Sequence, residues 1–175
     1  MPTLVAAETD ERDALLQFLA AQRGALRRAL GGLTREQATS RPTASELSVA
    51  GLVKHCAEVE SNWIRVDLAG RPSLRPRDVT NWSDSHRLVE GEEIEAVLAF
   101  YDQVEAETAE IVAALPDLDA TVPLPEAPWF PKDARRSGRW ILMHLIEETA
   151  RHAGHADIIR ESIDGATAFA LLGWK

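Results

Sequence analysis

The stretch at residues 141–159, ILMHLIEETARHAGHADII, carries several side chains that can bind a metal ion or move a proton. On an α-helix, His144, Glu148, His152 and His155 fall on one face, within roughly 80° at about 100° per residue. Glu148 and His152 are spaced i, i+4, which lets a carboxylate and an imidazole converge on one ion. At 1.5 Å per residue, His144 and His155 lie about 16 Å apart along the helix axis, so they cannot serve the same metal.

That face also carries apolar residues, among them Ile141, Leu145 and Ile159. A carboxylate and an imidazole buried there cost several kcal/mol unless they are paired. A divalent metal would meet that cost, and so would a hydrogen-bonded His–Glu pair at the edge of the core. The spacing alone leaves both interpretations open.

A third candidate ligand, His55, lies on the apolar stripe of an earlier predicted helix, in GLVKHCAEVESNW. A lone histidine on such a face can also be a core residue with an ordinary hydrogen bond. Together with Glu148 and His152 it makes two imidazoles and a carboxylate, as in catalytic zinc sites that keep an open position for water. Cys56 projects about 100° away from its neighbour and is expected in the core. His86 falls in a predicted loop and is expected to be solvated.

Four long segments with apolar residues at helical spacing must position these side chains. Ser48 suits a helix N-cap, Gly31 and Pro116 suit helix ends, and Thr34 to Gln37 reads as a capping box. Almost no segment reads as strand. We therefore predict an all-α fold, an antiparallel four-helix bundle with long connecting loops, forming a single domain over residues 1–175. The predicted helices cover residues 8–30, 48–70, 92–115 and 138–163.

Composition narrows the class of protein. Hydrophobic residues make up 45% of the 175 residues, so a sizeable core can be buried, and the formal net charge of −9 argues against nucleic acid or an anionic membrane as partner. One cysteine allows no intrachain disulfide and fits a reducing compartment. No cationic segment precedes an apolar run, and no stretch approaches about 18 uninterrupted apolar residues, so we expect a cytoplasmic protein.

The layout resembles the DinB-like (YfiT-type) four-helix metalloproteins, and within them the branch related to the N-terminal domain of mycothiol-dependent maleylpyruvate isomerase. The stretches that carry the resemblance are SVAGLVKHCAEVESNWI, RWILMHLIEETARHAGHADIIRE and the LTREQA and RP turn between the first two helices. The resemblance covers essentially the whole chain, and the run HLIEETARHAGHADIIRE is its most specific part.

The resemblance implies His55, Glu148 and His152 as metal ligands. Common members of the family use three histidines, and Glu148 takes the place of the first histidine of the C-terminal pair, as in the isomerase branch. His155 then becomes a pocket residue beside the ligands. The isomerase-like enzymes have a second domain, which we do not expect in this chain, so the resemblance implies a thiol S-transferase or isomerase more broadly.

The implied cofactors are a divalent metal and a low-molecular-weight thiol such as mycothiol. Zn²⁺ suits the three ligands, although Ni²⁺, Fe²⁺ or Mn²⁺ would also bind. A thiol in the open position would be deprotonated and could attack an electrophilic substrate. The same position could instead activate water for hydrolysis. A third alternative is a non-enzymatic stress-response or scaffold dimer with structural histidines, and a homodimer is expected in either case.

Loop residues are expected around the open position. Trp82, Trp129 and Phe130 offer flat apolar walls, although they could equally cover the helices as core. Arg139 and Arg151 are candidates for binding anionic groups of a thiol or substrate, although exposed arginines are commonly solvated.

Overall fold

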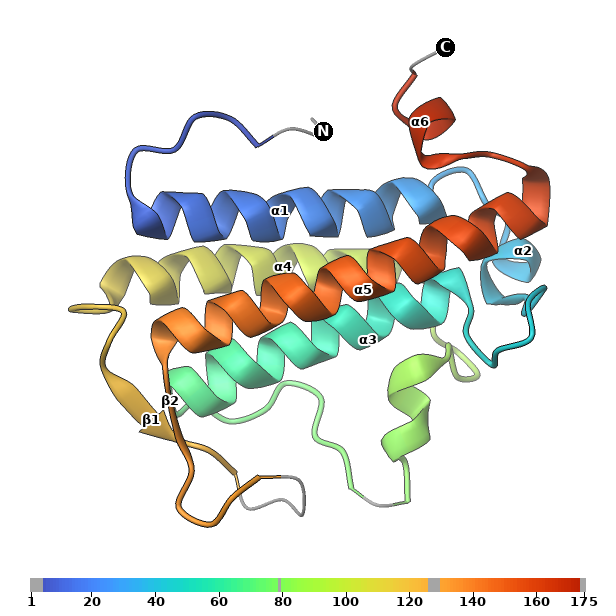
Figure 1. The fold of residues 1–175 in the computed structure, drawn as a ribbon. Coiled ribbons are helices and arrows are strands. Elements are labelled where there is room, and N and C mark those ends of the chain that lie inside the picture. Colours follow the sequence, from blue (N-terminus) through green and yellow to red (C-terminus); the bar gives the residue numbers. More distant parts are fainter. Residues whose placement is uncertain (1–4, 79, 126–129, 174–175) are drawn as a thin grey trace.

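The protein, described here by a computed structural model covering residues 5–78, 80–125 and 130–173, folds around four long helices (Figure 1). The predicted four-helix bundle is confirmed. The long helices are α1 (Glu11–Leu30), α3 (Val49–Ser61), α4 (Ile94–Ala114) and α5 (Gly138–Asp164). The shorter elements are α2 (Arg35–Thr39), η1 (Asn62–Leu68), η2 (Trp82–His86), β1 (Thr121–Pro123), β2 (Arg135–Ser137) and α6 (Ala168–Leu171).

Local capping chemistry sets most helix ends. The side chains of Asp10, Ser48 and Ser137 cap α1, α3 and α5 by accepting hydrogen bonds from backbone N–H groups of the first turn. Thr34 and Gln37 form the predicted capping box at the start of α2. Gly165 ends α5 with φ 77°, a left-handed conformation that favours glycine.

The predicted helix over residues 48–70 changes geometry at Ser61. Beyond that residue the chain continues as η1, a π-helix, in which the Ala69 N–H donates to the Ile64 carbonyl five residues earlier. Apolar periodicity does not distinguish a π turn from an α turn, so the change in geometry is not visible in the sequence pattern. Such wide turns are rare and concentrate at functional sites.

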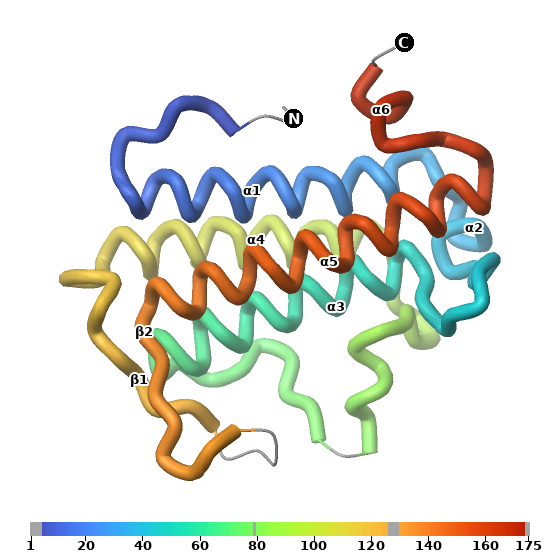
Figure 2. The backbone as a smooth tube through the Cα atoms, viewed as in Figure 1, coloured from blue at the N-terminus to red at the C-terminus, as the bar shows by residue number. Residues whose placement is uncertain are grey.

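The direction of the helices departs from strict alternation. Figure 2 shows α1 and α5 running one way and α3 and α4 the other. Glu11 pairs with Arg139 near the starts of α1 and α5, and Arg160 donates to the Ala29 carbonyl near their ends, so this neighbouring pair is parallel. The connection over residues 69–93 crosses the length of the bundle, which makes α3 and α4 parallel as well.

Two segments expected as loop carry regular structure. β1 pairs antiparallel with β2, Val122 opposite Arg136, and this small ribbon leads directly into α5. The crossing connection contains η2, a 3₁₀-helix that ends at His86. Short strands with polar and proline residues lack the alternating apolar pattern that would have predicted them.

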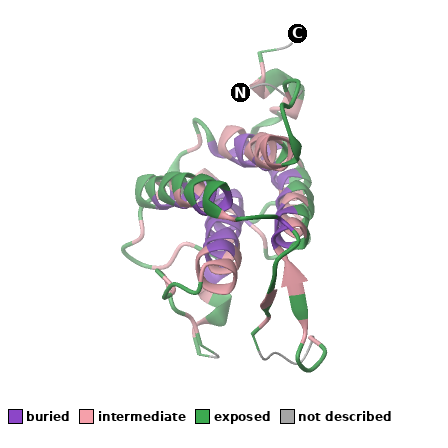
Figure 3. Cartoon of the chain, turned by 90° about the vertical axis from the view of Figure 1, so that its left-hand side faces the viewer, coloured by how far each residue is buried: buried purple, intermediate pink, exposed green. Residues whose placement is uncertain are grey.

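The core consists of two apolar clusters with a polar layer between them, and Figure 3 shows the buried residues on the inner faces of the helices. One cluster includes Leu26, Leu52 and Tyr101, and the other includes Leu19 and Ile141. Within the described residues, no helix combines the length and apolar character that a membrane crossing needs.

The polar layer is an ion pair between helices. Arg23 donates two hydrogen bonds to Glu60, at 2.9 and 2.5 Å, and the Thr108 hydroxyl donates to the same carboxylate at 2.5 Å. All three side chains are buried. Because each charge is paired and hydrogen-bonded, the layer fixes how α1, α3 and α4 align along their axes.

The crossing connection is tied to α3 by charge. Buried Glu58 accepts two hydrogen bonds from Arg77, both at 2.6 Å. Lys54, also buried, donates to Glu92 at 2.5 Å and to the Arg87 carbonyl at 3.0 Å. These contacts hold the connection against α3 on both sides of η2, so that η2 lies over this helix.

We predict that Glu58→Ala loosens the crossing connection. Removing one member of a buried pair costs about 3–5 kcal/mol because the other charge is left uncompensated. Chemical denaturation should show a loss of about 3 kcal/mol in the free energy of unfolding, and limited proteolysis should cut within residues 71–93 first. The control is Glu110→Ala, which breaks an exposed pair with Arg71 and should cost less than about 1 kcal/mol. Equal losses in the two variants would contradict the anchoring role.

Candidate metal centre

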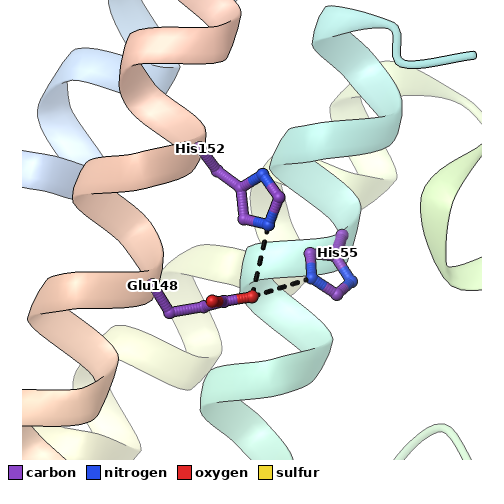
Figure 4. Close-up of side chains that lie close together, drawn as sticks. All are labelled: His55, Glu148 and His152. Carbon is purple, nitrogen blue, oxygen red and sulfur yellow. Dashed lines mark hydrogen bonds and ion pairs between the residues drawn. The ribbon is translucent and has the colours of Figure 1, made fainter. Parts of the chain in front are cut away.

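Three side chains from two helices converge at the edge of the bundle. His55 projects from α3, while Glu148 and His152 project from successive turns of α5 (Figure 4). A single carboxylate oxygen, Glu148 Oε1, lies 3.3 Å from His55 Nε2 and 3.2 Å from His152 Nε2. The side chains are 12%, 24% and 12% exposed for His55, Glu148 and His152, respectively, so the cluster is shielded on the core side and open at Glu148.

The cluster fits a small divalent ion. One donor atom from each of the three residues can be chosen so that all lie within 4.8 Å of one another. In a tetrahedral site with bonds of about 2.0–2.1 Å, neighbouring donor atoms are about 3.3 Å apart. The two distances to Glu148 already match that edge, and three ligands leave a fourth position for another molecule.

The electrostatics keep Glu148 ionised. Hydrogen bonds from His152 and from His55 hold the pKa of the Glu148 carboxyl well below its usual range, against the opposing effect of burial. An anionic carboxylate between two imidazoles is the protonation state that a cation requires of its ligands.

His155 supports the cluster from behind. Its Nδ1 lies 3.3 Å from His152 Nδ1, so one ring donates to the other at the nitrogen that faces away from Glu148. With a metal bound, the His152 Nδ1–H would donate to His155, and such an outer hydrogen bond holds the tautomer whose Nε2 lone pair faces the metal. The pocket role implied for His155 is thus placed one shell outside the three donors.

The expectation that His86 is solvated was wrong. Its ring stacks on the ring of His55, with centroids 4.0 Å apart, because the crossing connection folds back over α3. Burial, together with neighbouring His55 and His152, lowers the pKa of His86 to about 4, so its ring is neutral near pH 7. Among the described residues His55 Nδ1 is buried without a hydrogen-bond partner, and this stacking covers it instead.

Gly51 makes that stacking possible. A Cβ atom at this position would lie 2.1 Å from the His86 carbonyl oxygen, closer than any side chain tolerates. Gly51 stands one helical turn before His55, so the absent side chain lets η2 approach the helix beside the first ligand.

An aromatic cavity of about 550 Å³ opens beside Glu148. His144 lies in its wall, where its ring stacks on Trp140 with centroids 5.1 Å apart. Four wall residues come from the π-helix η1, which places them on one side of the cavity. The described lining consists of Val59, Asn62, Trp63, Val66, Asp67, Trp82, Pro125, Phe130, Trp140, His144 and Glu148.

Of the remaining sequence candidates, some line the cavity and others do not. Trp82 and Phe130 line the cavity as expected, whereas Trp129 lies outside the described residues. Arg139 pairs with Glu11 and Asp119, away from the cavity lining. Because those carboxylates already neutralise Arg139, the sequence-based candidacy of this arginine for a substrate anion finds no geometric support.

Arg151 is likewise directed outward. Its side chain is 62% exposed and donates to Glu147 at 2.7 Å, one turn earlier on α5. It is adjacent to His152 in sequence but points to another face of the helix, as consecutive helical residues do.

Several residues of the cavity wall have no site role in the sequence-based predictions, among them Trp63, Asp67 and Trp140. The ring centroids of Trp63 and His144 lie 5.0 Å apart, so η1 contacts α5 here. No local sequence pattern predicts this contact. Trp63 and Asp67 lie on the π-helix η1, and helical periodicity in the sequence does not reveal a π-helix.

We predict that Gly51→Ala displaces η2 from α3. Forcing extra volume into such a close contact costs about 1–3 kcal/mol, which denaturation should register. The His86 and His55 ring resonances should shift together in NMR spectra. Gly154→Ala on α5 is the matched control, because its Cβ would meet nothing within 4 Å and helix propensity should raise stability by up to about 1 kcal/mol. An unchanged His86 environment in Gly51→Ala would refute the role of this glycine.

Comparisons with solved structures support the fold. A conserved protein from Enterococcus faecalis is similar at a TM-score of 0.70 with 16% identity, covering 91% of this chain and 99% of that one. YfiT from Bacillus subtilis, described as a probable metal-dependent hydrolase with an unusual four-helix bundle topology, is similar at a TM-score of 0.55 with 17% identity, covering 100% of this chain and 94% of that one. At these identities the likeness concerns the fold.

The sequence comparisons give the family. No curated protein matches the chain. The family model described as mycothiol-S-transferase matches residues 14–165, which include both helices of the candidate metal centre and the cavity between them. The chain therefore belongs to the mycothiol-S-transferase family of DinB-like proteins.

Proposed function

We propose that this protein is a metal-dependent S-transferase that joins a low-molecular-weight thiol, mycothiol, to an electrophilic substrate. The observation that carries the proposal is the convergence of three metal donors, within 4.8 Å of one another, at the wall of an aromatic cavity. Membership of a family named for this activity supports the choice of thiol. In the overall reaction the thiol S–H bond breaks and the sulfur bonds to an electrophilic carbon. That carbon either loses a leaving group, which departs with the proton, or belongs to a double bond whose other carbon takes the proton.

His55, Glu148 and His152 would hold the ion, with zinc as the proposed metal. A cation bound by these residues lowers the pKa of a thiol in the open position, so that thiolate is present near neutral pH. His155 fixes the ring of His152, and His86 fixes the ring of His55. The aromatic wall excludes water from the side on which the substrate would sit.

Hydrolysis is the second candidate, because YfiT is described as a probable metal-dependent hydrolase. The same three ligands and open position could serve water. A non-enzymatic scaffold role is the third candidate. Metal content distinguishes it from the two enzymatic candidates. A homodimer and a cytosolic location remain predictions. Analytical ultracentrifugation would test the predicted homodimer.

We predict about one divalent metal per chain, removed by substitution of the ligands. Elemental analysis after purification without chelator should detect it, and His55→Ala or His152→Ala should lose most of it. The matched control is His144→Ala, a cavity histidine outside the three donors, which should retain the metal. Retention of metal in the double variant His55→Ala and His152→Ala would refute the ligand assignment and favour a scaffold.

We predict that Glu148 acts as a ligand. Glu148→His should retain the metal, because common relatives carry histidine at this place, whereas Glu148→Ala should weaken binding severely. Competition with a chromogenic chelator gives the affinities. If Glu148→Ala bound metal as the parent does but lost activity, Glu148 would be a general base instead.

We predict that a thiol enters the open position. In a cobalt-substituted sample, titration with mycothiol should produce sulfur-to-metal charge-transfer absorption, with bacillithiol, glutathione and simple thiols as comparison. A free thiol with a pKa of about 8.5 is mostly protonated near neutral pH, so the band reports stabilised thiolate. Absence of the band with every thiol, together with hydrolysis of an ester or amide panel, would favour the hydrolase.

A further inference from the structure

The cavity contains a carboxyl group that no side chain among the described residues neutralises. Asp67 lines the wall on η1, and within the described residues it has neither a hydrogen bond nor an ion pair. Its neighbour Arg65 is directed elsewhere, to Glu107 and to the Pro72 carbonyl. Burial raises the pKa of Asp67 to about 6, so the carboxylate form predominates at pH 7 and above despite its poor solvation. An unpaired, half-buried carboxylate in a cavity carries a desolvation cost, which a ligand that pairs with it would offset.

Asp67 also stands where two cavities adjoin. A second cavity of about 540 Å³ lies between residues 66–70 and 122–125. Val66, Asp67 and Pro125 line both cavities, so Asp67 lies in the wall where the two meet. Two adjoining spaces with one polar group at their junction suit a ligand whose apolar part fills the aromatic cavity and whose polar end reaches Asp67.

The surroundings of Asp67 are aromatic, and the described part of the cavity lining includes no arginine or lysine. Trp63, Trp140 and Phe130 line the same cavity, and tryptophan faces attract cations. The charged residues in the described lining are Asp67 and Glu148, both acidic. Arg136 lies 5.0 Å from the centroid of the Trp140 ring, outside that lining, and donates to the Arg135 carbonyl.

We infer that the cavity binds a substrate with an apolar or aromatic body and a cationic group that pairs with Asp67. The inference rests on the proposed function, whose electrophilic substrate it assigns to a chemical class. At the Asp67 end of the cavity anionic groups are disfavoured, because their charge would meet the unpaired Asp67 carboxylate in an environment of low polarity, whereas Glu148 would be neutralised by the bound ion. Asp67 acts here as a specificity-determining residue.

The test compares three probes with the same phenyl group and different charge: phenethylamine, 2-phenylethanol and phenylacetate. Binding to the purified, metal-loaded protein is measured by isothermal titration calorimetry at about pH 8, above the pKa of Asp67. Because a hydrogen bond to a charged group contributes about 1.5–3 kcal/mol, phenethylamine should bind at least about tenfold more tightly than 2-phenylethanol. Phenylacetate should bind most weakly in the metal-free variant His152→Ala, where no ion can hold its carboxylate.

Asp67→Asn should abolish the preference for the amine while leaving the affinity for 2-phenylethanol unchanged. The unchanged neutral probe shows that the cavity still folds. Asp157→Asn is the matched control, since Asp157 is another half-buried carboxyl with a raised pKa, on α5 and outside the cavity lining. This variant should keep the tenfold preference.

In His152→Ala, phenylacetate binding as tightly as phenethylamine would overturn the inference, and so would an amine preference that survives Asp67→Asn. Metal content and thiol binding are measured on the same samples. Failure of the S-transferase proposal can therefore be distinguished from failure of the inference about Asp67. Amine selectivity that persists in His152→Ala, a variant without metal, would support the inference even where the S-transferase proposal fails.

Discussion

The structure depends on the buried polar side chains of α3 between Lys54 and Glu60, each of which needs a partner from another element. Lys54 pairs with Glu92, and His55 pairs with Glu148. Glu58 pairs with Arg77, and Glu60 pairs with Arg23. The desolvation cost of each group is several kcal/mol unless a partner offsets it. A single helix therefore specifies the position of α1, of the crossing connection and of α5 at once.

This constraint explains why the candidate metal centre lies at the edge of the bundle. The ion pair between Glu60 and Arg23 is closed and holds no room for a ligand, since Thr108 completes it. The cluster of His55 and Glu148 lies one turn earlier and is open on one side. Similar polar residues thus align the helices in the interior and form the candidate metal centre at the edge, and the two sets differ in their access to solvent.

The parallel arrangement of α3 and α4 has a direct consequence for the cavity. A short hairpin between these helices would leave the outer side of α3 bare, whereas the long crossing connection covers it with η2. His86 and Trp82 reach the site in this way, from a segment with no helical periodicity of its own. The π-helix η1 supplies the opposite wall, so the cavity combines two irregular segments on a regular frame.

The sequence by itself determined the four long helices, several of their caps and the set of candidate donors, because these depend on spacing within one segment. Glu148 and His152 meet by helical geometry alone, and His55 was identified by its place on an apolar stripe. Only the tertiary structure decided that His86 stacks on His55 and that Asp67 faces the cavity unpaired. Those outcomes depend on contacts between segments far apart in the chain, which no local period encodes.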